Sequence, residues 1–385
     1  MRLPTLPYEA AVRLPGVRFV DLRSPREFAE DHLPGAVNVP LFDDRQRAVV
    51  GTLYAKESAD AAYEAGLEMV EERLAGLLEE VLDVPVAADA WRPRFRELTA
   101  WGRDGRFQEA VEWTAPDPLP ASPIVLNCWR GGMRSRSVVA LLQALGERRA
   151  VHLSGGYKAY RAWVRQRLVE LEPTMPLIVL RGPTGVGKTR ILAAIEREAP
   201  GTTIDLEGFA QHRSSVLGDV GLAPVSQKAF ETALIARLAQ LGPPPWFVEG
   251  ESRKVGDAVV PEPLFEAMEA AVQVRIDGSL EHRVGVLAAD YLPTQEHASE
   301  LRDRLPFLEK RLGKKWTGQL SAWLDQGDWR RVAEVLLERY YDPRYGHHDQ
   351  RRRWALEIDA EQPQLVAQLL ALRPACGGGG GASGG

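Results

Sequence analysis

The chain has 385 residues, which is too long for one ordinary core because single domains usually span roughly 100–200 residues. Hydrophobic residues make up 45% and charged residues 26%, and no apolar run reaches the ~18 residues that a membrane-spanning helix needs. The net charge of −5 argues against bulk, non-specific affinity for nucleic acid, and 2 cysteines exclude a disulfide framework or a Cys-rich zinc site.

The first half of the chain alternates short apolar strands with helices. Residues 1–7 hold no apolar segment before a small-residue cleavage site, so we expect a cytoplasmic protein. Between about residues 43 and 118, Ala, Leu, Glu and Arg recur at helical spacing, which predicts a helical insertion. The expected strands of this half lie at residues 17–22, 32–40, 123–127 and from 151 onward.

The second half repeats this alternation after a linker. Residues 172–176 form the linker, because prolines stop the preceding helix. Strands are then expected at residues 177–181, 202–206 and 246–249. The alternation predicts an α/β protein with parallel sheets and helices on both faces. Its expected parts are an N-terminal domain at 1–172, a second domain at 173–373, and a disordered glycine-rich tail without function at 374–385, which contains Cys376.

A cysteine at the end of an apolar strand is the first candidate site. Cys128 opens a glycine-containing turn before a helix, where backbone amides and the helix dipole favour a bound anion and a thiolate. Cys128 is therefore the candidate nucleophile, and the alternative is a buried structural cysteine. The candidate anion-binding residues are Arg130, Gly131, Gly132, Met133 and Arg134.

The second candidate site matches the pattern GxxxxGK[ST] at every fixed position. Its loop amides can cradle a diphosphate, Lys188 supplies a point charge, and the Thr189 hydroxyl can reach a metal ion such as Mg²⁺ held between phosphates. Both a Mg²⁺-dependent and a metal-free site are compatible with the sequence. The predicted diphosphate-binding residues are Gly182, Pro183, Thr184, Gly185, Val186, Gly187, Lys188 and Thr189.

Carboxylates follow two neighbouring strands of the second half. Such side chains are candidates for holding a metal ion or a water molecule, and a surface ion pair with Arg253 or Lys254 is the competing interpretation. The acidic candidates are Asp205, Glu207, Glu249 and Glu251.

Basic and aromatic residues are interleaved in two regions, the insertion and the segment 302–354. Aromatic rings stack on exposed bases while Lys and Arg neutralise phosphates, so both regions are candidate RNA surfaces. The alternative is a solvated helical face whose rings point into a core. The aromatic residues concerned are Trp91, Trp101, Trp316, Trp329, Tyr340, Tyr341, Tyr345 and Trp354.

The Cys128 loop resembles the active loop of the rhodanese family, and residues 21–28 and 32–40 resemble its N-terminal signatures, which we interpret as scaffold. The spacing Cys-x5-Arg-Ser is one residue longer than is common in single-domain sulfurtransferases and equals that of Cys-dependent phosphatases, so the loop should admit a phosphate-sized anion.

The whole chain up to about residue 373 resembles the tRNA 2-selenouridine synthases, through Cys128 to Ser135, residues 205–213 and residues 248–256. The resemblance implies a rhodanese-like domain with a helical insertion, fused to a P-loop NTPase-like α/β domain. It also implies replacement of sulfur by selenium in wobble-position 2-thiouridine, through an S-geranyl intermediate. The family pattern Glu-Asp-Glu-Ser reads Glu249-Gly-Glu251-Ser here, so one acidic group is missing.

The resemblance implies two co-substrates, geranyl diphosphate at Gly182 to Thr189 and selenophosphate at Cys128, with Arg130 and Arg134 steering the anion. The expected partners are a tRNA bearing 2-thiouridine and a selenophosphate-producing enzyme, with no membrane. Three alternatives stay open: a sulfurtransferase fused to an ATP-dependent kinase or ATPase, a Cys-dependent phosphatase, and a redox-sensing or RNA-binding adaptor.

Overall fold

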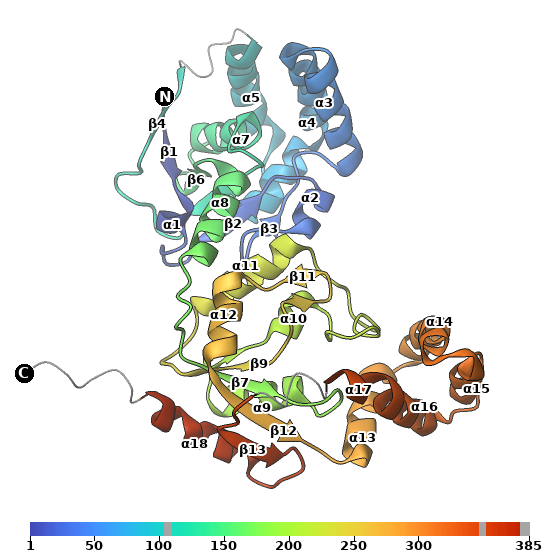
Figure 1. Cartoon of the computed structure of the whole chain (residues 1–385). Helices are drawn as coiled ribbons and strands as arrows, with labels where there is room; N and C mark the ends of the chain where they lie inside the picture. The colour runs from blue at the N-terminus through green and yellow to red at the C-terminus, as the bar shows by residue number, and fades with distance from the viewer. Residues whose placement is uncertain (104–109, 346–351, 378–385) are drawn as a thin grey trace, which may run out of the picture. The chain divides into compact units, whose positions relative to one another are not determined.

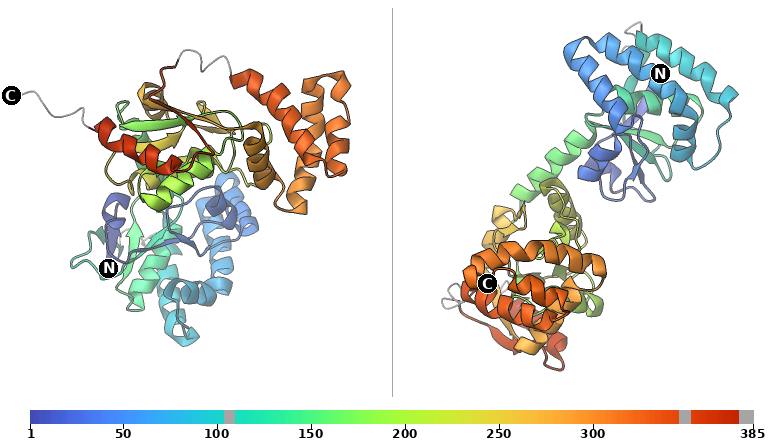
Figure 2. Two further views of the ribbon diagram at one scale, coloured as in Figure 1. Left: turned by 90° about the horizontal axis from the view of Figure 1, so that it is seen from below. Right: turned by 90° about the vertical axis from the view of Figure 1, so that its right-hand side faces the viewer.

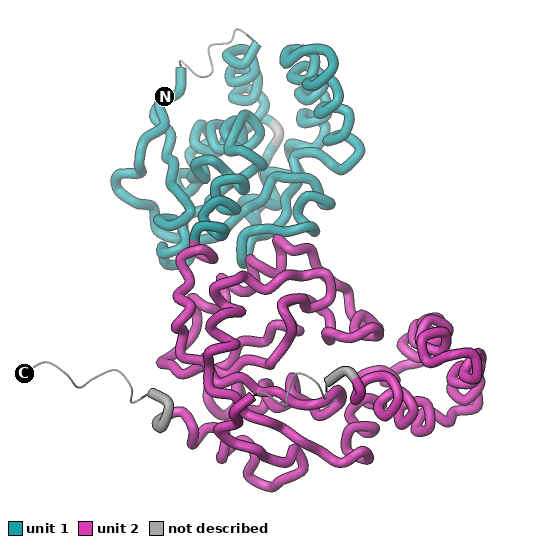
Figure 3. The backbone as a smooth tube through the Cα atoms, viewed as in Figure 1, with its two compact units in different colours: residues 1–166 teal, residues 167–385 magenta. Residues whose placement is uncertain are grey.

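The computed structural model describes residues 1–103, 110–345 and 352–377. The chain divides into two compact units, residues 1–166 and 167–385 (Figure 3). The division lies inside helix α8 (Gly156–Val169), which precedes the predicted linker at residues 172–176. Within the described residues, no helix is long and apolar enough to cross a membrane.

The first unit is built on a six-stranded parallel sheet with the order β3-β2-β5-β6-β1-β4 (Figure 1). This sheet confirms the predicted α/β class. Its strands are β1 (Arg2–Leu6), β2 (Arg18–Asp21), β3 (Val37–Asn38), β4 (Glu112–Thr114), β5 (Ile124–Asn127) and β6 (Ala150–Leu153). Its helices besides the insertion and α8 are α1 (Tyr8–Ala11), α2 (Pro25–Glu30) and α7 (Met133–Ala144).

Three helices form the insertion of the first unit: α3 (Asp44–Lys56), α4 (Ala59–Leu82) and α5 (Ala88–Arg103). Leu77 and Leu78 of α4 and Trp91 of α5 are buried in the same hydrophobic cluster as Leu126 of β5, so the insertion shares the core of the sheet. Strand β4 lies within the range of the predicted helical insertion and pairs with β1. The helical part therefore ends before Glu112, since Ala110 is still helical, and residues 104–109 lie outside the described residues.

The second unit has a five-stranded parallel sheet with the order β13-β12-β7-β9-β8. Helices α9 and α18 bury leucines and isoleucines in one cluster with β7 and β12. The strands are β7 (Leu177–Arg181), β8 (Thr203–Ile204), β9 (Trp246–Glu249), β12 (Val272–Asp277) and β13 (Leu356–Asp359), with a small hairpin of β10 (Lys254–Val255) and β11 (Ala258–Val259). The helices are α9 (Lys188–Glu198), α10 (Leu206–Ala210), α11 (Gln227–Leu238), α12 (Glu262–Ala270) and α18 (Leu365–Gly377).

Residues 280–345 of the second unit form a helical subdomain between β12 and β13. Its helices lie together beside the sheet of their own unit (Figure 2). They enclose a separate hydrophobic cluster that includes Leu301, Leu305 and Leu308. The elements are α13 (Leu280–Tyr291), α14 (Gln295–Leu312), the 3₁₀ turn η1 (Lys314–Trp316), α15 (Gln319–Asp325), α16 (Trp329–Leu336), the π-helical turn η2 (Leu337–Tyr341) and α17 (Asp342–Tyr345).

The structure decides between the two interpretations for four of the aromatic residues near basic clusters. Trp91, Trp329, Tyr340 and Tyr341 are buried, because their large apolar rings fill the cores of the insertion and the helical subdomain. They cannot stack on bases. Trp316 is only partly buried and stays a candidate for contacts at the surface. Trp323, which was not predicted from the sequence, is also partly buried.

Helix α18 includes the first residues of the predicted tail. Helix α18 continues to Gly377, past residue 374, where the sequence predicts disorder. Because Leu365 and Leu369 anchor the earlier turns in the core, the last turn extends a helix that is already formed. Residues 378–385 lie outside the described residues.

Candidate functional site

The loop from Gly182 to Thr189 connects β7 to the N-terminus of α9, as the motif predicts. Two of its glycines, Gly185 (φ 80°) and Gly187 (φ 92°), adopt left-handed conformations that favour glycine. A Cβ atom at Gly182 would overlap the carbonyl oxygen of Ile276. The backbone is thus free to wrap around a phosphate at the helix N-terminus.

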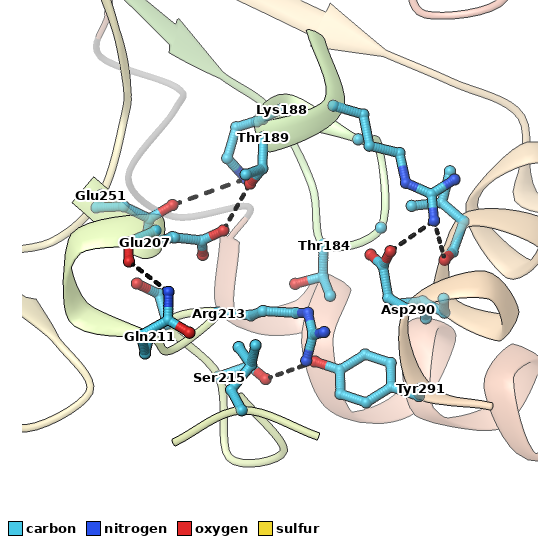
Figure 4. Close-up of a pocket in the computed structure, with 18 residues that line it drawn as sticks. Thr184, Lys188, Thr189, Glu207, Gln211, Arg213, Ser215, Glu251, Asp290 and Tyr291 are labelled. Atoms are coloured by element: carbon cyan, nitrogen blue, oxygen red, sulfur yellow. Dashed lines mark hydrogen bonds and ion pairs between the residues drawn. The ribbon is translucent and has the colours of Figure 1, made fainter. Parts of the chain in front are cut away.

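Lys188 and Thr189 bring the loop into contact with the carboxylates. The Lys188 ammonium donates to the Gly182 carbonyl at 3.3 Å and lies 4.0 Å from a Glu251 carboxylate oxygen. The Thr189 hydroxyl donates to Glu207 Oε2 at 2.8 Å (Figure 4). The structure therefore places the cation, the hydroxyl and both carboxylates around one point.

The two remaining acidic candidates, Asp205 and Glu249, hold the backbone of α10, which carries Glu207. Glu249 Oε1 accepts a hydrogen bond from the backbone amide of Glu207 at 2.7 Å, and Asp205 caps α10 by accepting from Gly208 at 2.8 Å. Glu249 is fully buried, and its Oε2 has no hydrogen-bond partner among the described residues. The interpretation of Glu249 as part of a surface ion pair is wrong, and Arg253 pairs with Glu262 at 3.6 Å instead.

Burial and mutual repulsion raise the pKa values of these carboxyl groups. Burial, with the nearby charge of Glu251, raises the pKa of Glu207 to about 7. Burial raises the pKa of Asp205, and burial together with Asp205 raises the pKa of Glu249 well above its usual range. Within the described residues, no group of three or more His, Cys, Asp or Glu side chains has the arrangement of a metal site.

A cavity of about 310 Å³ opens in front of the loop. Two walls of this cavity were not predicted from the sequence: the segment after α10 and helix α13. In the sequence, Gln211 and Arg213 are marked only by the family pattern at residues 205–213, and α13 only by its helical spacing. These walls consist of Gln211, Arg213, Ser214, Ser215, Leu222, Val286, Leu287, Asp290 and Tyr291.

The Cys128 loop lies in the first unit, between β5 and α7, as predicted. The Cys128 side chain is 2% exposed, and its Sγ lies 3.2 Å from the Ser135 hydroxyl. Gly132 is the N-cap of α7, so the sulfur lies near the start of a 12-residue helix. This position is consistent with a thiol reached by a small anion, although burial alone also fits the structural alternative.

Contacts from α8 and β6 fix the shape of this loop. The amides of Tyr157 and Lys158 donate to the carbonyls of Cys128 and Trp129, each at 2.9 Å. The His152 ring of β6 lies 3.1 Å from the Gly131 carbonyl, and burial lowers the pKa of His152 to about 4. His152 is therefore neutral and supports the loop, a role that the sequence did not reveal.

The two arginines of the loop differ in their surroundings. Arg130 is exposed, whereas Arg134 lies 3.5 Å from Glu27 and is largely buried. Met133 is the first residue of α7 and packs against the core. The structure thus brings Arg134 into an ion pair, and Arg130 has the greater freedom to meet an anion.

The N-terminal signature is scaffold, as interpreted from the sequence. Asp21 and Arg23 form a buried ion pair at 2.7 Å, and the Arg23 guanidinium lies 3.7 Å from the Tyr157 ring centroid. Tyr157 donates to Asp31 at 2.8 Å. This network joins the end of β2 to α8, which in turn holds the Cys128 loop.

Comparisons with known proteins match a different family model in each of the two units. The family model of the tRNA 2-selenouridine synthase AAA domain matches residues 175–373, and that of the rhodanese-like domain matches residues 7–77. The tRNA 2-selenouridine synthase of Cupriavidus necator is 33% identical, over 93% of this chain and 95% of that protein. Those of Cupriavidus pinatubonensis (31%, over 88% and 90%) and Pseudomonas syringae pv. syringae (30%, over 93% and 96%) are similar.

Among solved structures, the N-terminal domain of a putative ATP/GTP binding protein from Clostridium difficile 630 is 31% identical. The match spans 42% of this chain and 98% of the solved domain, with a TM-score of 0.29. The sheets and the family matches together confirm the predicted pairing of a rhodanese-like domain with a P-loop domain.

Proposed function

Because the chain belongs to the tRNA 2-selenouridine synthase family, we propose that it replaces the sulfur of a 2-thiouridine in tRNA by selenium. The first step is S-geranylation with geranyl diphosphate, and the second is exchange of the geranylated sulfur for selenium from selenophosphate. The similarity extends over both units, so it supports the two chemical steps within one chain.

The observation that carries the proposal is the cavity in front of Gly182 to Thr189. It combines a diphosphate cradle with an apolar wall of Leu222, Val286 and Leu287. An allylic diphosphate has the same two parts, an anionic head and an apolar tail. The loop amides and Lys188 would stabilise the diphosphate as it leaves, while the thiouridine sulfur forms a bond to the carbon that carried it.

The residues of the loop also fit a Mg²⁺ ion. Thr189 and Glu207 would hold it, since their oxygens lie 2.8 Å apart beside further carboxylates. When bound, the ion would neutralise charge on the diphosphate. Lys188 supplies a fixed positive charge at the same place, and Thr184 and Gly185 line the space for the phosphates.

We assign the selenium step to the Cys128 loop. Alkylation turns the 2-thiocarbonyl sulfur into a better leaving group, and a selenium nucleophile then displaces it. Cys128 helps to hold selenophosphate, with Arg130 as the exposed cation beside it. The selenium of this anion bonds to C2 of the uridine as the geranyl thiolate leaves, and water then cleaves the P–Se bond and releases phosphate. The Ser135 hydroxyl, 3.2 Å from Sγ, can donate to a thiolate and stabilise it.

The helical subdomain offers a surface for the tRNA. Lys310, Lys314 and Lys315 are exposed there, and the Lys315 ammonium lies 5.2 Å from the Trp316 ring centroid. Trp316 contacts Trp323, and the Arg331 guanidinium carbon lies 4.1 Å from the Trp323 ring centroid. Cations and partly buried rings in one place suit phosphates and exposed bases.

The test is incubation of 2-thiouridine tRNA with the protein and geranyl diphosphate alone, followed by mass spectrometry of the nucleosides. We expect geranylated 2-thiouridine with the wild-type protein and none with Lys188→Ala. Unmodified tRNA, combined with steady hydrolysis of ATP, would favour the ATP-dependent alternative.

A further inference from the structure

One guanidinium in the cavity has no charged partner. Arg213 lines the cavity and spends one donor, Nη1, on the carbonyl of Val220 at 2.8 Å. Its guanidinium also lies 5.0 Å from the Tyr291 ring centroid. No ion pair to Arg213 occurs within residues 1–103, 110–345 and 352–377, and most of its five N–H donors stay available for an anion.

The other arginines near the cavity are already neutralised. Arg190 pairs with Asp290, and Arg283 pairs with Asp342 while donating to the Thr184 carbonyl at 2.9 Å. These two arginines therefore have a structural explanation in ion pairs. Arg213 has none, and a half-buried guanidinium without a counterion is costly unless a ligand supplies the charge.

The backbone around Arg213 is strained. Gln211 (φ 49°) and Ser214 (φ 45°) occupy left-handed conformations although neither is glycine. The Ser214 hydroxyl is buried without a hydrogen-bond partner among the described residues, and it belongs to a residue that lines the cavity. Strain of this kind persists where the surrounding structure holds residues in position for a ligand.

Figure 4 shows the geometry of this wall. The Arg213 side chain runs across the cavity toward Tyr291, and Thr184 of the phosphate-binding loop faces the same space. The Ser215 hydroxyl is fixed 3.3 Å from the Tyr291 hydroxyl. Thus the cavity has one wall of loop amides with Lys188 and a second wall with Arg213 and Ser214.

We propose that Arg213 and Ser214 form a second phosphate-binding subsite that faces the loop Gly182 to Thr189 across the cavity. This inference rests on the proposed function, because both the leaving diphosphate and the tRNA backbone would bring phosphate oxygens into this space. An arginine fork matches the oxygens of a phosphate, and the free Ser214 hydroxyl can donate to the same group.

The test compares two ligands with the full chain: inorganic pyrophosphate by calorimetry, and 2-thiouridine tRNA by filter binding at fixed salt. The variants are Arg213→Ala, Arg213→Lys and the matched control Arg197→Ala, which removes an exposed arginine of α9 outside the cavity and outside the helical subdomain. Arg213→Lys keeps the positive charge without the planar fork of the guanidinium, and the thermal midpoint of each variant measures how far the side chain supports the turn.

We expect Arg213→Ala to weaken one ligand by roughly tenfold or more, with partial rescue in Arg213→Lys and no change in the control. Loss for pyrophosphate alone assigns the subsite to the leaving diphosphate, and loss for tRNA alone assigns it to the RNA backbone. Unchanged affinity for both overturns the inference. Equal losses together with a lowered thermal midpoint also overturn it, because they indicate a structural role.

The failure of this inference differs from the failure of the proposed function. If the wild-type protein and Lys188→Ala bind pyrophosphate equally poorly, the diphosphate site itself is wrong. If wild-type binding is intact and depends on Lys188, while Arg213 has no effect on either ligand, only the second subsite is wrong.

Discussion

Glu207 is the residue on which the electrostatics of the cavity depend most directly. It accepts the Thr189 hydroxyl, and its pKa of about 7 means that its charge changes near neutral pH. Below that pH the carboxyl group is neutral, and above it a negative charge lies beside the phosphates. The ionised form of Glu207, which predominates above about pH 7, can therefore repel a free diphosphate and attract a metal ion.

We expect metal-free pyrophosphate binding to weaken as the pH rises from about 6 to 8, by roughly three- to tenfold, because ionised Glu207 repels the ligand. In Glu207→Gln the part of this pH dependence that comes from Glu207 should disappear. Calorimetry with a chelator measures both proteins, and the variant retains the ligand's own titration as a control. Profiles of equal slope in the two proteins would contradict this role of Glu207.

At the scale of elements, helix α8 determines the shape of the Cys128 loop. Its first residues donate to the loop carbonyls, and Gly156 (φ 57°) is so close that a Cβ atom there would overlap the Cys128 carbonyl oxygen. The thiol is therefore held by a helix on a different part of the chain rather than by its own loop alone.

Gly156→Ala should displace the loop and remove selenium transfer, while geranylation and pyrophosphate binding persist in the second unit. Gly76→Ala in α4, where an added Cβ meets no atom within 4 Å, is the matched control. Nucleoside mass spectrometry with both co-substrates gives the readout. Selenium transfer at the wild-type rate in Gly156→Ala would refute the importance of this contact.

The helical subdomain is the element from which we expect the main contribution to tRNA binding. Lys314→Glu should weaken tRNA binding and lower the slope of log affinity against log salt by about one unit, since one phosphate contact is lost. Arg197→Glu on α9 reverses one charge elsewhere in the same unit as a control. Filter binding at several salt concentrations measures both, and equal slopes would point to the insertion instead.

The motifs made much of the site predictable from the sequence. The Gly182 to Thr189 pattern and the Cys128 turn depend on local backbone requirements, which sequence records directly. Strand β1 was not predicted, because Pro4 and Pro7 disfavour a strand. The segment is a strand because it pairs with β4 and β6. The role of Arg213 was not predicted either, because its lack of a counterion can be seen only in the folded cavity.

The aromatic residues show the limit of composition as a guide. Trp91 and Tyr340 lie next to arginines in the sequence, yet the cores of the insertion and the helical subdomain bury them. Whether a ring faces solvent depends on which side of its helix packs, and interleaving with charges does not determine that side.

At the scale of the whole molecule, we propose that each unit carries one of the two chemical steps. The phosphate cradle and its acidic cluster belong to the second unit, and Cys128 with its supporting network belongs to the first. The account therefore requires that the two chemical steps can be blocked independently.

The most direct test is mass spectrometry of nucleosides from 2-thiouridine tRNA incubated with geranyl diphosphate and selenophosphate, comparing wild type, Cys128→Ala and Lys188→Ala. The account predicts 2-selenouridine with the wild type, accumulation of the S-geranyl nucleoside with Cys128→Ala, and unmodified 2-thiouridine with Lys188→Ala. Selenium incorporation that persists in Cys128→Ala, or geranylation that persists in Lys188→Ala, would contradict the assignment of the steps to the two units.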